Sequence, residues 1–392
     1  MGRRCMVLSA SMGAGHDTVA AELARRLRAA GHDVLVRDVL ALLPPGAGPA
    51  VRSFYRFTVR HAPWLYELIY AVFLAPGPAE AGPAEASRGA APARGRLDVS
   101  PMAALAEKRL AALVRSWRPD VVVSTFHLAG QVTGRMRRRG TLRVPSAVFV
   151  TDFALHRAWL EPGNDAFLCV SEAGARTARA LTGRPAAAPG PVVPPGFDRP
   201  PRSEAWAERL ARAGGGRPPV LLSAGAWGVG NGLQATAGAL AGRGFLPVLL
   251  CGRDARLRRR AARAAGVLAL GWVDDMPGLM SAARLLVDNA AGQTSVQALA
   301  ARVPVIGYRP IPGHGAVGVR RMAAEGLTVY ASGVAELLEL AERLVRPGPE
   351  REGRVERGAA VFRDDAARLV AGLGAPPAGD PSAEPEAGQP CA

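Results

Sequence analysis

The chain has 392 residues, of which 49% are hydrophobic, and its formal net charge is +16 at pH 7. This length predicts two domains of ordinary size. No charged segment precedes a long apolar run, and no stretch of about eighteen apolar residues occurs, so we expect neither a classical secretion signal nor a membrane-spanning helix. Arginine supplies the basic charge apart from Lys108, and no helix-turn-helix, zinc-finger or RNA-recognition signature is present, so we expect no nucleic-acid partner. The four cysteines are far apart and are expected to be free thiols in a reducing cytoplasm.

In the first half of the chain, short apolar runs alternate with amphipathic stretches. Residues 18–30 have the spacing of an amphipathic helix, and residues 166–181 have the pattern of a strand, a turn and a helix. Further strands are predicted at 6–10, 32–38, 119–127 and 144–153. This alternation is typical of a parallel, doubly wound sheet.

An aromatic-rich segment at residues 51–77 interrupts this pattern in a chain that is only 5% aromatic. One interpretation is a pair of core helices. The other is a lipid-facing surface, because Trp and Tyr favour the headgroup boundary and Arg contacts anionic lipid. Residues 75–100, which follow, are of low complexity and are predicted to form a disordered insertion. The aromatic side chains and their flanking arginines are Phe54, Tyr55, Phe57, Trp64, Tyr66, Tyr70, Arg52, Arg56 and Arg60.

Proline and glycine dominate residues 183–203, which indicates a linker, and the strand–helix pattern then restarts. Residues 218–240 have the pattern of a strand, a glycine-rich turn and a helix, and more strands are predicted at 246–254, 267–273, 283–290 and 303–310. The predicted organisation is a first domain at 1–185, a linker at 186–203, a second domain at 204–345, helices packing back at 346–373 and a disordered tail at 374–392.

The first glycine-rich turn ends in a histidine, in the order Gly13, Ala14, Gly15, His16. A P-loop is excluded because no lysine follows. A dinucleotide fingerprint would need a third glycine where Thr18 stands, although Asp38 ends the second strand as a ribose-binding acid would. A purely structural turn and a chemical role for the histidine also remain. In the first turn of a helix the macrodipole disfavours imidazolium, which suits a neutral general base.

Two further turns of this kind follow strands in the second half. The turn at 223–232 contains Gly225, Gly228 and Gly230, and the turn at 288–295 ends in Thr294 and Ser295. Thr or Ser at a helix start caps the helix, which is the structural interpretation. The same geometry offers backbone N–H groups to a phosphate. We expect the three turns to face one cleft between the two domains.

The motifs in these turns resemble one known family. The stretch "SASMGAGHDTVAAEL" lies near the start, "VTDF" and "HRAW" in the middle, and "GWVDDMPGLMSAARLLVDNAAGQTSVQALAARVPVI" near the end. The chain resembles the monogalactosyldiacylglycerol synthase and diacylglycerol glucosyltransferase family over residues 4–345. That family is related to the bacterial transferase that forms lipid II. The resemblance implies an α/β GT-B fold, in which two Rossmann-like domains face each other across a cleft.

The resemblance also implies the chemistry and the location. It implies inverting transfer of a hexose from a UDP-sugar to a diacylglycerol-type lipid, with no cofactor or metal. It implies peripheral contact with anionic lipid at the cytoplasmic face of the plasma membrane. Matched to the family's motifs, His16 is the general base, with Asp152 on the acceptor side. The donor would contact Gly225, Gly228, Gly230, Arg253, Trp272, Val273, Gly292, Gln293, Thr294, Ser295 and Gln297. The acceptor would contact Gly13, Gly15, His156 and His314.

One departure from the family pattern concerns ribose binding. The family has glutamate three residues after the threonine, where this chain has Gln297. Glutamine keeps one acceptor oxygen but loses the charge and the bidentate grip. The alternatives are therefore a degenerate protein that binds nucleotide or lipid without turnover, or a GT-B transferase with a soluble acceptor.

Overall fold

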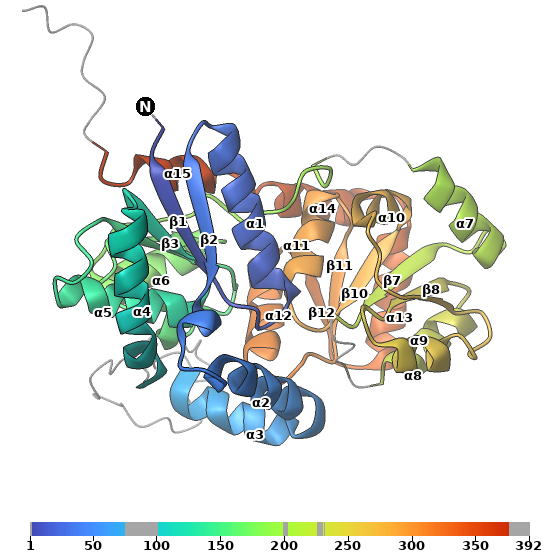
Figure 1. The fold of residues 1–392 in the computed structure, drawn as a ribbon. Coiled ribbons are helices and arrows are strands. Elements are labelled where there is room, and N and C mark those ends of the chain that lie inside the picture. Colours follow the sequence, from blue (N-terminus) through green and yellow to red (C-terminus); the bar gives the residue numbers. More distant parts are fainter. Residues whose placement is uncertain (1, 75–100, 199–202, 226–229, 231, 376–392) are drawn as a thin grey trace, which may run out of the picture.

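The computed structural model describes residues 2–74, 101–198, 203–225, 230 and 232–375. Within these residues the chain forms two parallel six-stranded sheets, each flanked by helices (Figure 1). Two doubly wound halves of this kind confirm the predicted α/β class. The insertion predicted at 75–100, the predicted donor residue Gly228 and most of the tail predicted at 374–392 lie outside the described residues.

The first domain contains the sheet with strand order β2-β1-β3-β4-β5-β6. Its central strand β1 is an unbroken apolar run from Cys5 to Leu8 with 0% exposure, because helices cover both faces of a parallel sheet. The strands are β1 Arg4–Ser9, β2 Asp33–Asp38, β3 Val121–Ser124, β4 Ser146–Val150, β5 Ala166–Cys169 and β6 Ala186–Ala187. The flanking helices are α1 Ala14–Ala29, α4 Pro101–Trp117, α5 His127–Arg138 and α6 Glu172–Thr182, with short helices η1 Val39–Leu42 and η3 Arg157–Trp159.

The second domain contains the sheet with strand order β12-β11-β10-β7-β8-β9. Its strands are β7 Pro219–Ser223, β8 Leu246–Leu250, β9 Leu268–Leu270, β10 Leu285–Asp288, β11 Val305–Tyr308 and β12 Val329–Ala331. Its helices are α7 Glu204–Gly214, α8 Leu233–Gly242, α9 Ala255–Ala261, α10 Met276–Ala282, α11 Gln293–Ala300, α12 His314–Ala324, α13 Val334–Val345 and α14 Pro349–Ala359. Strand β1 is an interior strand of the first sheet and β10 of the second, and the turns that follow them lie at the carboxyl ends of these sheets.

Most of the strands are shorter than the sequence pattern predicts, β3 and β4 among them, and one short strand is added. The strand predicted at 119–127 ends at Ser124, and His127 already begins α5. The strand predicted at 144–153 ends at Val150. Ala186 and Ala187, the first residues of the predicted linker, form the edge strand β6 and pair with β5. In each case the end of the strand falls in a short polar or Ala/Pro-rich stretch. The sequence pattern does not show where the hydrogen bonds between neighbouring strands stop.

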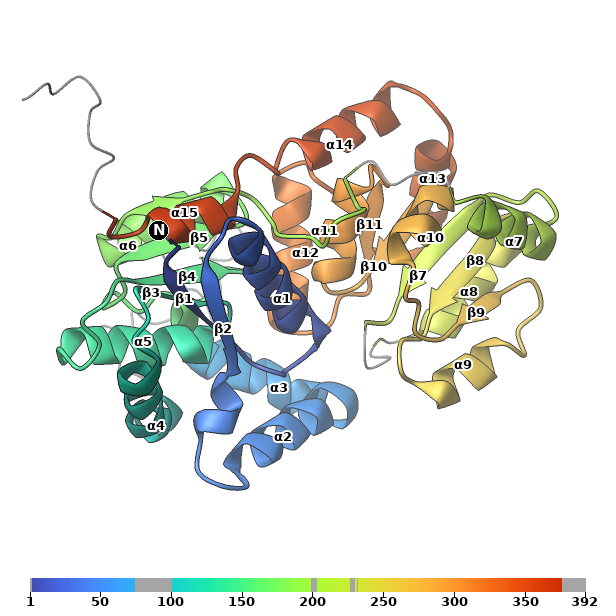
Figure 2. The ribbon, with the colours of Figure 1, turned by 45° about the horizontal axis from the view of Figure 1, so that its top comes forward.

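The end of the chain returns to the first domain. Helix α15, Ala366–Gly372, lies beside α1 and the first sheet, as Figures 1 and 2 both show. Arg3 Nη1 donates to the Leu373 carbonyl at 2.8 Å, and Arg26 pairs with Asp365 at 3.4 Å. These contacts tie the C-terminal helices to the domain that holds β1.

The aromatic-rich segment forms two amphipathic helices, α2 Ala47–His61 and α3 Pro63–Ile69, and then the π-helical turn η2 Tyr70–Leu74. Tyr66 and Tyr70 are 6% and 5% exposed and pack inward. Large apolar side chains on the other face are exposed: Phe54 53%, Phe57 55%, Trp64 67%, Leu68 54% and Val72 50%. The core interpretation therefore holds for the inner face of this helix pair, and the outer face is an exposed apolar surface. No helix among the described residues is both long and apolar enough to cross a membrane.

Candidate functional site

The starts of α1 and α11 meet between the two domains. A Cβ atom built on Gly15 would lie 3.8 Å from the Cβ of Gln293, so the first and third glycine-rich turns are in contact. Both views place α1 beside the helices that follow β10 and β11 (Figure 2). Gln293 Nε2 also donates to the Val192 carbonyl at 3.0 Å, which fixes its side chain to the connecting segment. The space beside Gly13 is open, with no atom within 4 Å of a Cβ built there.

His16 stands in the first turn of α1 and is held by one of its two ring nitrogens. Its Nδ1 lies 3.1 Å from the Thr125 carbonyl oxygen and 3.1 Å from Thr151 Oγ1. A carbonyl oxygen only accepts, so Nδ1 carries the proton and Nε2 is the basic nitrogen. The ring packs edge-on against Phe126 at 4.9 Å between centroids. These contacts fix the orientation of the imidazole ring.

Asp152 is connected to this histidine through a hydroxyl group. Thr151 Oγ1 donates to Asp152 Oδ1 at 3.3 Å, and Trp159 Nε1 donates to Asp152 Oδ2 at 3.1 Å. The "VTDF" and "HRAW" motifs are thus joined by a hydrogen bond across one turn. The Trp159 ring is also 6.2 Å from His16, so both motifs line the same side of the imidazole.

A second pair of histidines lies next to this group. The rings of His127 and His156 are 5.2 Å apart, and Trp159 packs against them at 5.8 and 5.9 Å. Burial lowers the pKa of His127 to about 3 and the pKa of His156 well below its usual range. Both rings are therefore neutral at physiological pH. The sequence pattern predicted His156 as an acceptor contact but did not single out His127, which begins α5, or Thr151, which directly follows β4.

On the donor side, Asp288 shapes the turn that leads into α11. Its carboxylate accepts the N–H groups of Ala290 at 2.9 Å and Ala291 at 2.7 Å, and burial raises its pKa. The first bond inside α11 runs from Val296 N to the Gly292 carbonyl at 3.2 Å. The N–H groups of residues 293–295 precede that bond, at the positive end of the helix macrodipole, where the sequence predicted a phosphate contact.

The side chains of this turn differ in how accessible they are. Ser295 is 1% exposed, so its hydroxyl group is not accessible to a phosphate. Gly292 is exposed, and Thr294 and Gln297 are half-buried and lie one turn apart on the same helix face. The predicted phosphate and ribose contacts therefore share one end of α11.

Arg253 and Trp272 form a stacked pair. The Arg253 guanidinium lies 4.3 Å from the centroid of the Trp272 ring, and that ring is 47% exposed. Val273 follows directly and packs partly into the core of the second domain. The residues predicted to hold a base are thus adjacent in space, at the end of β8 and after β9.

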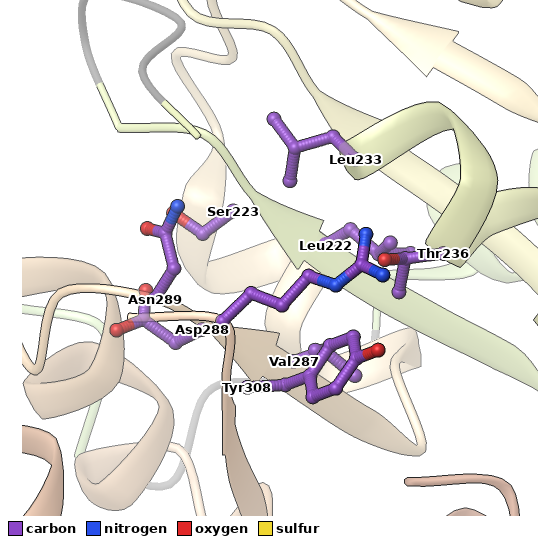
Figure 3. A pocket seen from close by; sticks show the side chains of 9 residues that line it. Leu222, Ser223, Leu233, Thr236, Val287, Asp288, Asn289 and Tyr308 are labelled. Carbon is purple, nitrogen blue, oxygen red and sulfur yellow. The ribbon is translucent and has the colours of Figure 1, made fainter. Parts of the chain in front are cut away.

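A pocket lies at the carboxyl ends of β7, β10 and β11, beside the start of α8 (Figure 3). Asp288, Asn289 and Ser223 come from the strand ends, and Leu233 and Thr236 come from α8. The remaining lining residues are Leu222, Val287, Tyr308 and Arg309. The Asn289 side chain, which lines the pocket, lies so close to Gly230 that a Cβ would not fit there. The second glycine-rich turn therefore reaches this pocket.

Arg309 supplies the positive charge of this pocket, and the sequence pattern did not single it out. Its guanidinium lies 5.3 Å from the centroid of the Tyr308 ring and fills the space where Gly232 would carry a Cβ. Its backbone has φ 47°, a conformation that non-glycine residues rarely adopt. Such strain at a strand end is common in functional sites. Arg309 therefore lies next to the second glycine-rich turn, at the start of α8, where the sequence predicted a phosphate contact.

Solved structures define the class of this molecule. MurG from Acinetobacter baumannii aligns with a TM-score of 0.53 and 14% identity, covering 95% of this chain and 98% of that one. The Anabaena protein Alr3699/HepE in complex with UDP and glucose aligns with a TM-score of 0.54 and 14% identity, covering 94% and 97%. The chain has the GT-B glycosyltransferase fold, as the sequence predicted.

Sequence comparisons confirm the resemblance to the lipid glycosyltransferases. Residues 93–192 match the family model described as monogalactosyldiacylglycerol (MGDG) synthase. A processive diacylglycerol beta-glucosyltransferase of Staphylococcus carnosus is 26% identical over 61% of this chain and 62% of its own length. A protein of the same name from Bacillus cytotoxicus is 22% identical over 94% of this chain and 92% of its own length. The alignment with the Staphylococcus relative thus spans less than two thirds of that protein.

Proposed function

We propose that this chain is an inverting glycosyltransferase that transfers a hexose from a UDP-sugar to the hydroxyl group of a diacylglycerol-type lipid. The observation that carries the proposal is the contact between Gly15 and Gln293, which brings the residue before His16 against the first residue of α11. A neutral base and a site for a phosphate leaving group are the two elements that such a transfer requires. The names of the similar proteins, which act on diacylglycerol, support the choice of acceptor.

In the proposed mechanism, the acceptor oxygen attacks C1 of the sugar while its proton passes to Nε2 of His16. The bond between C1 and the phosphate oxygen breaks, and UDP leaves with the electron pair. Thr125 and Thr151 keep the proton of Nδ1 in place, and the Asp152 carboxylate stabilises the imidazolium through the Thr151 hydroxyl. The N–H groups at the start of α11 and the Arg309 guanidinium stabilise the charge on the diphosphate, and no metal is required.

The nucleotide would lie along the carboxyl ends of the second sheet. Arg253 and Trp272 are the proposed contacts of the uracil ring, and Thr294 and Gln297 those of the diphosphate and ribose. The complex of HepE with UDP and glucose, a structure of the same fold, supports a UDP-sugar as donor. Gly13, Gly15, His156 and His314 are the proposed acceptor contacts, at the face that the first domain turns toward α12.

The direct test is a donor screen. The protein is incubated with radiolabelled UDP-glucose, UDP-galactose or UDP-N-acetylglucosamine and with membranes that contain diacylglycerol, and label is measured in the lipid phase. Incorporation from one donor supports the proposal. Label that enters only water-soluble products would instead favour a soluble acceptor, and nucleotide binding with no transfer from any donor would favour a degenerate protein.

Gln297 is the residue that favours the degenerate alternative, and it gives a prediction. Replacing Gln297 with glutamate should tighten UDP binding by about tenfold, because a carboxylate accepts both ribose hydroxyls in charge-assisted hydrogen bonds. Isothermal titration calorimetry with UDP measures the dissociation constant. Gln297→Ala is the control, because it removes the side-chain contact with the ribose. A looser complex in Gln297→Glu would contradict the assignment of Gln297 to the ribose.

We also propose that the exposed face of α2 and α3, with the exposed Arg56 on α2, binds the anionic inner surface of the plasma membrane. Replacing Phe57 and Trp64 with serine should weaken binding to phosphatidylglycerol vesicles by at least about tenfold, because both side chains lose apolar area that lipid would bury. Vesicle cosedimentation measures this. Leu181→Ser, at an apolar side chain 44% exposed on α6, is the control and should leave binding unchanged. Equal binding by all three proteins would rule out this surface.

A further inference from the structure

Two side-chain contacts join the helix pair α2–α3 of the first domain to the second domain. Arg60 Nη2 lies 2.6 Å from Asp254 Oδ2, across 194 residues of sequence. Tyr66 Oη lies 2.6 Å from His314 Nδ1, across 248 residues. The same helix pair carries the exposed Phe54, Phe57 and Trp64. It therefore touches the donor half of the molecule with one side while its apolar side chains face outward.

The Arg60 contact ends next to the stacked pair Arg253 and Trp272. Asp254 caps α9, since its Oδ1 accepts the N–H groups of Arg256 and Leu257, each at 2.9 Å. The Leu257 N–H, together with the charge of Arg60, holds the pKa of Asp254 below its usual range, so the carboxylate is charged at neutral pH. The Asp254 side chain is 8% exposed, whereas its partner Arg60 is 34% exposed, so the pair lies at the edge of the contact between the domains. Arg253 directly precedes this carboxylate in the chain, so the ion pair from the first domain ends beside the proposed base contact.

In the second contact, the protonation states of Tyr66 and His314 suit a hydrogen bond between them. Burial raises the pKa of Tyr66 and lowers that of His314, so a protonated phenol donates to a neutral imidazole. Gly313, the residue before α12, has φ 74°, and a Cβ there would approach Tyr66 Cε1 at 2.9 Å and Tyr70 Cγ at 3.1 Å. The tyrosines are therefore packed directly on the backbone at which α12 begins.

We propose that Arg60 and Tyr66 are positioning residues that couple membrane binding to donor binding. They act through Asp254 and His314, so a membrane that orders α2 and α3 also orders the element that holds the nucleotide base. This inference rests on the proposed function, because it takes the outer face of α2–α3 as the lipid contact and Arg253 with Trp272 as the base contact. Coupling of this kind is reciprocal: vesicles tighten nucleotide binding by the factor by which nucleotide tightens vesicle binding.

The test uses the full chain, UDP, and vesicles of phosphatidylglycerol mixed with phosphatidylcholine. The dissociation constant of UDP is measured with and without vesicles, and vesicle partitioning is measured with and without UDP. We expect both to change by the same factor of about five or more. In Arg60→Gln and in Tyr66→Phe the factor should fall toward one, although each ligand is still bound by itself. Arg60→Lys, which keeps the charge, should retain most of the coupling.

Arg56→Gln is the matched control. It removes the same charge from an exposed position on the same helix, so vesicle binding weakens as in Arg60→Gln, but the coupling factor should stay that of the unaltered chain. A factor of one in the unaltered chain, with both ligands bound, would overturn this inference alone. Loss of coupling in Arg56→Gln as well would also overturn it, since charge rather than the contact would be responsible. If the unaltered chain bound no vesicles, the inference and the proposed lipid surface would both be wrong, whereas the donor site would be unaffected.

Discussion

Replacing His16 with alanine is expected to lower kcat by about two to four orders of magnitude while UDP binding persists. The imidazole is the group placed to accept the proton of the acceptor hydroxyl, and its Nδ1 is already engaged by Thr125 and Thr151. Without it, the hydroxyl must lose its proton to water. The donor contacts lie on the second domain and are untouched, so the loss should appear in kcat and leave the UDP dissociation constant unchanged.

Label transfer into lipid and UDP titration measure the two halves of this prediction. His32→Ala is the control, because His32 lies at the start of β2 and accepts a hydrogen bond from the backbone of Arg3 at 3.1 Å, far along the chain from the turn. Thr151→Val gives an intermediate case: it keeps the base but removes its link to Asp152, and kcat should fall by a smaller factor. Unchanged turnover in His16→Ala would remove the histidine from the mechanism.

The second large effect is expected at Arg309, where substitution by alanine should lower kcat by about a hundredfold. The guanidinium lies beside Gly232 and over Tyr308, at the pocket into which the second glycine-rich turn folds. Charge on the diphosphate grows as the sugar leaves, so a cation there stabilises the transition state more than the bound donor. The effect should therefore be larger on kcat than on the affinity for the UDP-sugar.

Arg302→Ala is a close control for this substitution. Arg302 also has a left-handed backbone, with φ 60°, and lies exposed after α11, so alanine meets a comparable backbone strain at both positions. Single-turnover kinetics separate the chemical step from donor binding. Equal effects of the two substitutions would mean that backbone strain, and not the charge near the phosphate, is responsible.

The sequence predicted the sheets well because buried parallel strands are recorded as short apolar runs. The pattern also located the three glycine-rich turns, since each follows such a run and precedes a helix. It gave no signal for Arg309, which is one of many arginines in an arginine-rich chain and differs from the others only by what surrounds it. Thr151 was likewise invisible, because a threonine at the end of a strand is ordinary until a histidine is found 3.1 Å away.

The aromatic segment shows what amino-acid composition can and cannot predict. Its residues predicted both a core and a lipid surface, and the structure assigns Tyr66 and Tyr70 to the inside and Phe57 and Trp64 to the outside. Local spacing fixes which side chains share a helix face, but the partner domain fixes which face is covered.

By itself, then, the sequence determined the strand–helix order, the positions of the turns and the resemblance to lipid glycosyltransferases, because these follow from local periodicity and short motifs. Only the tertiary structure brought Gly15 against Gln293, joined Asp152 to His16 through Thr151, and paired Arg60 with Asp254. Such contacts depend on how the two domains pack against each other. That packing is set by the burial of many side chains that are far apart in the sequence, so the spacing of neighbouring residues does not predict it.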